Sequence, residues 1–229
     1  MNYTRLGFKW YLLNLKNPTV APYANLGEVK LRITARSTSK DDAIKQIQPI
    51  KKELERKFTK YIFGEDNDTL SSVIIKLLKE RNESIVFAES CTGGLLSSSI
   101  TSEAGASEIF KGGIVAYSNE IKQNILGVPK SFLDTHGAVS EEVAEKMARG
   151  VKDKLNADWA IAISGIAGPQ GGTEMKPVGL VYISIISPNN KHTNIKKIYN
   201  SRRNRCEIQK LSVNECLNSL RLILLSNKG

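Results

Sequence analysis

The 229-residue chain has few of the side chains that most often bind metals or activate a nucleophile. It contains three cysteines, Cys91, Cys206 and Cys216, and two histidines, His136 and His192. The cysteines are odd in number and none stand in a Cys-x-x-Cys spacing, so neither a disulfide framework nor a zinc site is predicted. The sequence therefore predicts a protein of a reducing compartment without a metal centre.

Long apolar runs are also scarce. In the string "FKWYLLNLK", Lys9 and Asn14 interrupt the apolar patch, which lacks the length of a signal peptide or a membrane span. The expectation is a cytoplasmic protein with no membrane partner.

Charge is plentiful but unevenly placed along the chain. The formal net charge is +10; residues 1–75 carry 13 basic and 8 acidic side chains, residues 76–190 carry 11 and 13, and residues 191–229 carry 9 and 2. The basic ends suit an anionic partner such as nucleic acid, a membrane surface or a phosphorylated small molecule. A solvated, lysine-rich surface is the simpler interpretation.

Hydrophobic periodicity predicts a layered α/β sandwich with a largely parallel sheet, preceded by a small α+β module. Residues 17–28 are an extended or turn-rich lead-in. Residues 29–36 then alternate as a half-exposed strand, and residues 37–58 form a helix that Pro49 should kink. Beyond a linker at 64–69, strands and helices alternate, which indicates parallel pairing. The expected strands are 84–88, 112–118, 158–164, 179–186 and 193–200, and the expected helices are 69–82, 93–105, 119–127, 140–157 and 207–225.

Three polar loops follow predicted strands, which is where ligand sites gather in α/β sheets. They are "ESCTGG" at 89–94, "YSNEIK" at 117–122 and "SGIAGPQGG" at 164–172. Glycines let the backbone approach a ligand, and the free N–H groups that open a helix can hold an oxyanion or a phosphate.

The first loop offers Ser90, Cys91 and Thr92 as nucleophiles, or none of them. A serine needs a base, and neither histidine lies in these loops. Lys122 is suited by position, since the positive end of a helix disfavours an ammonium group, and Tyr117 could relay the proton.

The same residues also have plain structural interpretations. Glu89 and Thr92 can be helix caps, Cys91 a small buried filler and Lys122 a solvated surface lysine. The residues alone support an α/β domain with an anion or nucleotide site.

Several strings occurring in one order carry a family resemblance. "AESCTGG", "GGIVAYSNEIK", "GVP", "HGAVSEEVA", "SGIAGPQGG" and "KPVG" closely resemble the C-terminal domain of the CinA family, which includes stand-alone nicotinamide mononucleotide deamidases. The resemblance assigns residues 68–229 to that amidohydrolase domain. "NPTVAPYANLGEVKLRITA" resembles the KH-like middle domain of CinA proteins, assigned to residues 19–67. The larger molybdopterin-biosynthesis-like domain of those proteins is not expected here, and residues 1–18 are expected to be an extension or remnant.

The resemblance implies an activity and a site. The activity is hydrolysis of the carboxamide of nicotinamide mononucleotide to nicotinate mononucleotide and ammonia, in pyridine-nucleotide salvage, without metal or cofactor. Ser90 is the implied nucleophile and Lys122 its base, with Tyr117 assisting; a homodimer is also implied. We expect the oxyanion hole among the N–H groups of residues 92–94. The implied substrate-binding residues are Glu89, Thr92, Gly93, Gly94, Asn119, Ser164, Gly165, Gly168, Pro169, Gly172 and Arg203.

One string departs from the family. Relatives commonly have a "GDR" triplet whose arginine helps to hold the substrate, and the string here is "NSRRNR". Arg203 is taken as that arginine, while Arg202 and Arg205 add positive charge that suits a 5′-phosphate.

Two other functions are considered. RNA-binding KH domains clamp the backbone with a GxxG loop, and residues 19–65 contain only Gly27 and Gly64, so a nucleic-acid partner is not expected. The alternative to the enzyme is a catalytically weak nucleotide-binding or interaction module linked to competence or DNA repair.

Overall fold

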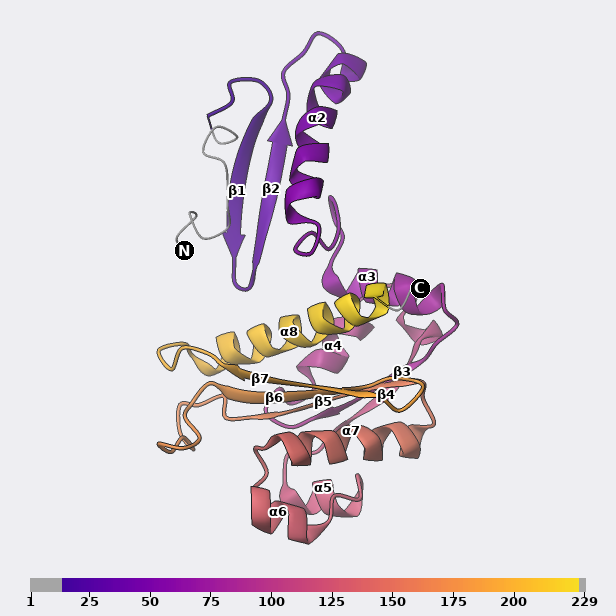
Figure 1. Ribbon diagram of the computed structural model, residues 1–229, viewed down its shortest axis with the longest axis vertical. Helices are drawn as coiled ribbons and strands as arrows, with labels where there is room; N and C mark the ends of the chain where they lie inside the picture. Colours follow the sequence, from indigo (N-terminus) through magenta and orange to yellow (C-terminus); the bar gives the residue numbers. More distant parts are fainter. Residues whose placement is uncertain (1–13, 227–229) are drawn as a thin grey trace. The chain divides into compact units, whose positions relative to one another are not determined.

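The computed structural model describes residues 14–226, which fall into two units (Figure 1). The first unit ends at Ile62 and the second begins at Phe63. Most of the expected extension at 1–18 lies outside the described residues.

The first unit is a hairpin packed on a helix. Strands β1 (Thr19–Asn25) and β2 (Glu28–Thr34) pair antiparallel, and helix α2 (Lys40–Phe58) closes a small core that contains Val20, Leu54 and Phe58. The alternation predicted for β2 is confirmed, because Leu31 and Ile33 pack on that core while their neighbours are exposed. Strand β1 was not predicted.

Pro22 explains why strand β1 was not predicted, and Pro49 does not interrupt helix α2. Pro22 lies inside β1, a position that only a sheet edge tolerates, and both strands of a two-stranded sheet are edges. Pro49 lies inside α2, which is continuous from residue 40 to residue 58.

The second unit is built on a five-stranded sheet in the order β4-β3-β5-β6-β7. Its strands are β3 (Ile85–Glu89), β4 (Phe110–Val115), β5 (Trp159–Gly165), β6 (Leu180–Ile186) and β7 (His192–Ile198). The α/β class is confirmed, but the expected share of parallel pairing is too high. Strand β3 is parallel to β4 and β5, whereas β5–β6 and β6–β7 are antiparallel. The reason is that no helix lies between β5 and β7, and parallel neighbours need a crossover connection.

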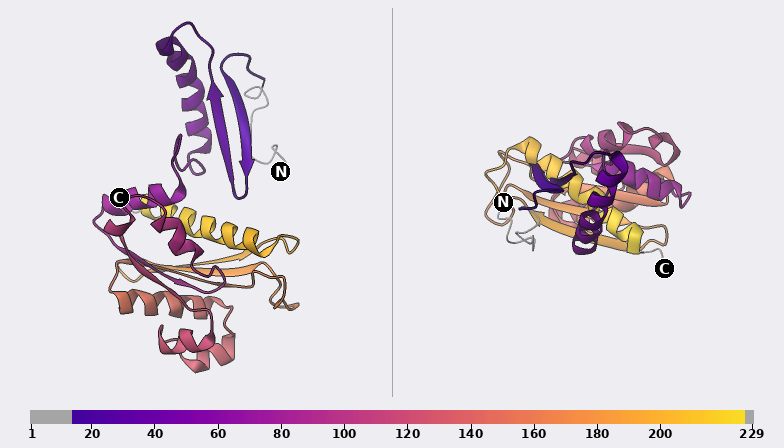
Figure 2. Two further views of the ribbon diagram at one scale, coloured as in Figure 1. Left: turned by 180° about the vertical axis from the view of Figure 1, so that it is seen from behind. Right: turned by 90° about the horizontal axis from the view of Figure 1, so that it is seen from above.

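Helices cover both faces of this sheet (Figures 1 and 2). One face carries α3 (Leu70–Lys79), α4 (Leu95–Thr101) and α8 (Arg205–Ser226). The other carries α7 (Glu141–Leu155), with the short helices α5 (Asn119–Asn124) and α6 (Lys130–His136) beyond it. Helix α6 was not predicted, because seven residues are too few to show a helical period. Across residues 14–226, no helix is long and apolar enough to span a membrane.

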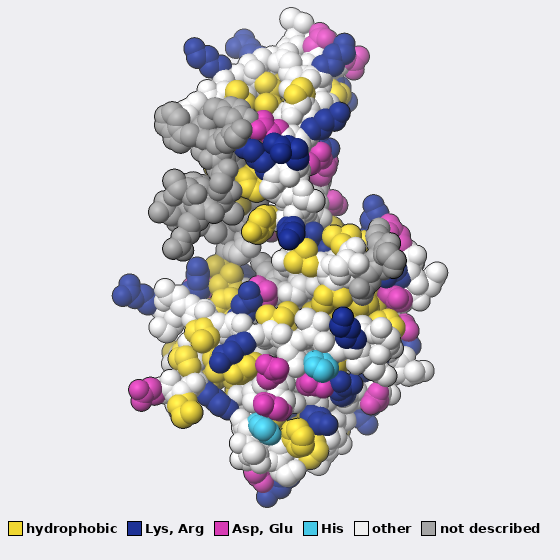
Figure 3. Space-filling view, viewed as in Figure 1, with side chains coloured by type: hydrophobic (Ala, Val, Ile, Leu, Met, Phe, Trp, Pro, Cys, Tyr) yellow, Lys and Arg dark blue, Asp and Glu magenta, His cyan; other side chains and the backbone are white. Residues whose placement is uncertain are grey.

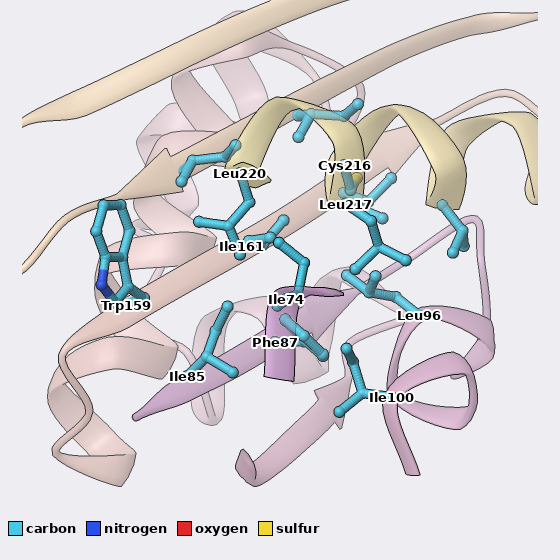
Figure 4. Close-up of a cluster of buried hydrophobic side chains, with 14 of the residues drawn as sticks. Ile74, Ile85, Phe87, Leu96, Ile100, Trp159, Ile161, Cys216, Leu217 and Leu220 are labelled. Atoms are coloured by element: carbon cyan, nitrogen blue, oxygen red, sulfur yellow. The ribbon is translucent and has the colours of Figure 1, made fainter. Parts of the chain in front are cut away.

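The two faces of the sheet are packed differently. Ile85, Phe87 and Ile161 face α3, α4 and α8, in a cluster of large side chains (Figure 4). On the α7 face, β5 presents Ala160 and Ala162 instead. Each large side chain buried in this way contributes about 1.5–3 kcal/mol. Small residues on the opposite face let α7 lie close to the sheet.

A glycine lets α7 pack closely against the segment after α5. A Cβ atom at Gly150 would overlap the carbonyl oxygen of Leu126, which is held at the end of α5. Gly150→Ala usually stabilises a helix interior, but here the overlap should lower the free energy of unfolding by about 2 kcal/mol. Urea unfolding measures this, with exposed Lys154→Ala on the same helix as the control. A stabilised Gly150→Ala protein would contradict the packing described.

Candidate active site

The three loops singled out from the sequence meet at one edge of the sheet. Strand β3 lies between β4 and β5 and is parallel to both, so the carboxyl ends of the three strands lie at the same edge. Ser90 follows β3 directly, Tyr117 lies just beyond β4, and Gly165 ends β5.

Ser90 and Lys122 are in contact. The Lys122 Nζ atom lies 3.2 Å from Ser90 Oγ, 2.7 Å from the Ala116 carbonyl oxygen and 3.2 Å from the Tyr117 carbonyl oxygen. Lys122 is only 1% exposed, and Ser90 is 9% exposed. The lysine belongs to α5, whose N-cap is Ser118, and Asn119 is the exposed first residue of that helix.

The surroundings of Lys122 favour a neutral amine. Burial lowers the pKa of Lys122, and no carboxylate among residues 14–226 forms an ion pair with it. A neutral amine has two N–H groups and one lone pair. When the two carbonyls accept the N–H groups, the lone pair is left to accept the Ser90 hydroxyl proton. This geometry can generate a serine nucleophile.

Glu89 is a structural cap. Its buried carboxylate accepts hydrogen bonds from the Gly94 N–H (3.0 Å), the Leu96 N–H (3.0 Å), the Ser97 N–H (2.8 Å) and the Ser97 hydroxyl (2.7 Å). These donors open α4, whose N-cap Gly94 has no side chain to satisfy them. Four donors occupy the acceptor sites of this carboxylate, so its hydrogen bonds are used in capping α4, and its expected contact with substrate stays a prediction.

Of the three N–H groups expected in the oxyanion hole, at residues 92–94, two already donate within the chain. The Gly93 N–H donates to the Ser90 carbonyl at 3.2 Å, and the Gly94 N–H is held by Glu89. Both glycines have positive φ, 62° and 101°, which a side chain would strain. The Thr92 N–H has no acceptor within the described part of the chain.

Cys91 is core packing. It is 4% exposed and joins the apolar cluster under α8, and burial raises the pKa of its thiol to about 12. A thiol that stays protonated at neutral pH is a poor nucleophile. Among the three hydroxyl or thiol side chains of the loop, only Ser90 touches a base.

Arg205 bonds to two of the three loops, whereas Arg203 bonds within its own segment. Arg205 donates to the Gly168 carbonyl at 3.0 Å and to the Tyr117 hydroxyl at 3.2 Å, whereas Arg203 pairs with Glu207 at 3.3 Å. Tyr117 is 63% exposed, and its hydroxyl accepts from Arg205 while its carbonyl accepts from Lys122.

A capping box opens α8. Asn204 and Glu207 exchange hydrogen bonds as a capping box, at 2.9 and 3.0 Å.

The third loop is held by packing. The Ser164 hydroxyl donates to the Ala138 carbonyl at 2.6 Å, and a Cβ atom at Gly165 or Gly172 would lie 2.7 or 2.8 Å from backbone atoms of the segment 178–180. These three residues therefore shape the loop, and their expected contact with substrate stays a prediction.

A cavity of about 670 Å³ adjoins the loop and the start of α8. Cavities that bind small molecules commonly have volumes of about 300–1,000 Å³. Its lining is partly apolar and strongly basic: Pro169, Val178, Ser201, Arg203, Asn204, Arg205 and Cys206.

Neither histidine is paired with a nucleophile or a metal ligand set. Both histidine side chains lie at the surface among acidic residues (Figure 3), His136 at 3.6 Å from Glu142 and His192 at 3.8 Å from Glu145. Over the described range 14–226, no three metal-ligating side chains are grouped.

The burial of Lys122 makes stability depend on pH. The unfolded chain keeps this proton up to the ordinary pKa of 10.5, whereas the folded chain releases it at lower pH. Between these two pKa values the unfolded state binds more protons, so stability rises with pH. The free energy of unfolding of Lys122→Met should therefore exceed that of wild type most at low pH. This difference in free energy should become smaller as the pH rises toward the alkaline range. Urea unfolding across the neutral to alkaline range checks this, and a difference independent of pH would contradict it.

Removing the Glu89 cap should destabilise the second unit. Glu89→Ala leaves three buried N–H groups and a hydroxyl unsatisfied, so unfolding should become easier by about 3 kcal/mol or more. Thermal unfolding measures this effect. Glu174→Ala, at an exposed loop position, is the control and should change stability by less than about 0.5 kcal/mol. Equal effects of the two substitutions would refute the capping role.

Relatives in sequence match both units. Residues 67–224 match the CinA C-terminal domain, and residues 11–64 match the damage-inducible protein CinA KH domain. A CinA-like protein of Prochlorococcus marinus strain MIT 9215 is 69% identical over 216 residues, covering 94% of this chain and 51% of that protein. The CinA-like protein of strain MIT 9515 is 66% identical over 215 residues, covering 94% and 50%. The chain thus spans about half the length of the curated relatives that it matches.

Solved structures agree with this assignment. The competence/damage inducible protein CihA from Agrobacterium tumefaciens is 36% identical, with a TM-score of 0.67 over 72% of this chain and 98% of that chain. The competence damage-inducible protein A from Klebsiella pneumoniae is 29% identical, with a TM-score of 0.66 over 70% and 97%. The chain belongs to the CinA family.

Proposed function

We propose that the second unit hydrolyses the carboxamide of nicotinamide mononucleotide to nicotinate mononucleotide and ammonia. One observation carries the proposal: a buried lysine amine, without a carboxylate partner among the described residues, lies 3.2 Å from a serine hydroxyl at the carboxyl edge of the sheet. A Ser/Lys pair in this setting is suited to acyl transfer. Amide hydrolysis is the reaction of that class which the family resemblance implies.

In the acylation step, Lys122 transfers a proton twice. Lys122 Nζ takes the Ser90 hydroxyl proton as Oγ attacks the carboxamide carbon, and the carbonyl oxygen becomes an oxyanion. The Thr92 N–H is the donor for this oxyanion, and one such donor lowers the barrier by about 3–4 kcal/mol. The Lys122 ammonium then gives its proton to the amide nitrogen, and ammonia leaves from a Ser90 ester.

Deacylation repeats the sequence with water. Neutral Lys122 takes a proton from water as its oxygen attacks the ester carbon, and the second oxyanion collapses to expel Ser90 Oγ. Lys122 returns the proton to the serine oxygen, and the carboxylate product is released.

The basic cavity suits the phosphate of the substrate. Arg203 and Arg205 line it beside the N-terminal end of α8, where the helix dipole favours negative charge. This assigns recognition of the 5′-phosphate to the 201–206 segment and the chemistry to residues 90 and 122.

The compartment, the oligomeric state and the partners of the protein are part of the same proposal. We expect a cytoplasmic homodimer that acts on a free nucleotide, without a membrane or nucleic-acid partner. The competing function is a nucleotide-binding or interaction module with negligible turnover, as the competence and damage names of the relatives suggest. Light scattering tests the dimer, and an RNA shift assay at physiological salt tests nucleic-acid binding.

Ammonia release from nicotinamide mononucleotide tests the enzyme directly. Wild type should release ammonia, and Ser90→Ala should lower kcat by at least about 10³-fold because the nucleophile is lost. Cys91→Ala is the matched control and should retain turnover. Equal, negligible rates for wild type and Ser90→Ala would favour the binding module, and an active Ser90→Ala with an inactive Cys91→Ala would reverse the assignment.

The lysine base should set the acid limb of the pH profile. Because only neutral Lys122 accepts the proton, kcat/KM should rise with pH through the lowered pKa of Lys122 and then level off. Lys122→Met should abolish turnover and leave the circular dichroism spectrum unchanged. Turnover retained in Lys122→Met would exclude lysine as the base.

A further inference from the structure

Thr92 is a buried residue with two unused polar groups. It is 3% exposed, its Oγ1 has no hydrogen-bond partner, and its N–H makes none of the backbone hydrogen bonds found among residues 14–226. Leaving such groups unpaired costs about 1–3 kcal/mol each, and buried groups in folded proteins are seldom left so. The unused pair lies two residues after Ser90, where a ligand oxygen would satisfy it.

The peptide that carries the Thr92 N–H is held by α8. Gln209 Nε2 donates to the Cys91 carbonyl at 2.8 Å, across 118 residues of sequence. The Cys91 carbonyl and the Thr92 N–H belong to the same trans peptide, whose C=O and N–H point in opposite directions. The Gln209 bond therefore directs the Thr92 N–H away from α8, and the peptide plane cannot turn over while the bond is made.

We propose that Gln209 is a positioning residue that holds the Thr92 N–H as the oxyanion donor for Ser90. The proposal rests on the proposed amide hydrolysis and goes beyond it, because Gln209 lies outside all three loops. Of the three N–H groups expected in the oxyanion hole, those of Gly93 and Gly94 already donate within the chain. Gln209 acts through the backbone of the loop and touches neither substrate nor Lys122.

Two substitutions separate the hydrogen bond from the bulk of the side chain. Gln209→Glu keeps the shape and loses the donor to the Cys91 carbonyl, whereas Gln209→Arg keeps a long donor. Since an oxyanion forms only in the transition state, Gln209→Glu should lower kcat by about 10–100-fold with KM changed less than about 3-fold. Gln209→Arg should recover most of kcat. Lys210→Ala, at the exposed neighbour on α8, is the control.

A second readout does not need the nucleotide. A fluorophosphonate probe is attacked by Ser90 Oγ, fluoride leaves, and the serine proton passes to Lys122, while the phosphoryl oxygen takes the place of the oxyanion. Mass spectrometry should show slow labelling of Ser90 in Gln209→Glu and near wild-type labelling in Gln209→Arg.

Each result bears on a separate claim. Wild-type kcat and labelling in a folded Gln209→Glu protein would overturn the inference, as would Gln209→Arg failing as badly as Gln209→Glu. A rise in KM at unchanged kcat would mean that Gln209 binds the ground state, which also overturns it. Wild-type protein that labels rapidly but releases no ammonia would refute the proposed substrate and leave the role of Gln209 supported; absence of both would refute both.

Discussion

A lysine amine held out of water between two backbone carbonyls is the interaction on which this site depends. Desolvation disfavours the ammonium form of Lys122, and the Ala116 and Tyr117 carbonyls fix the two N–H groups of the amine. The remaining lone pair faces Ser90. Burial and backbone geometry thus lower the pKa of this amine, in a chain that keeps its two histidines at the surface.

The first turns of α8 join the loops that surround this pair. Arg205 holds the Gly168 carbonyl and the Tyr117 hydroxyl, and Gln209, four residues later on the same helical face, holds the Cys91 carbonyl. The parallel half of the sheet brings the three loops to one edge, and the antiparallel half returns the chain so that α8 can pack across them. Each half of the mixed sheet has a distinct role in building the site.

Local patterns placed Ser90 and Lys122 among the candidates and the family resemblance selected them, while long-range contacts account for what was missed. Ser90 and Lys122 stand in loops after apolar strands, and both loops are visible in the sequence. Glu89 also stands there, but nothing in its neighbourhood shows that its oxygens are used within α4. Arg205 was expected only to add positive charge, because its hydrogen bonds to Gly168 and Tyr117 are long-range contacts that a string of arginines does not reveal. Gln209 has no sequence signal except that it follows Arg205 by one helical turn.

The path of the chain has a consequence for its synthesis. The nucleophile, its base and all three loops lie before residue 180, whereas Arg205 and Gln209 come from α8. A nascent chain that has not yet completed α8 already contains the reactive pair but lacks the contacts that order the loops. The contacts of Arg205 and Gln209 with the loops can therefore form only after α8 has been synthesised.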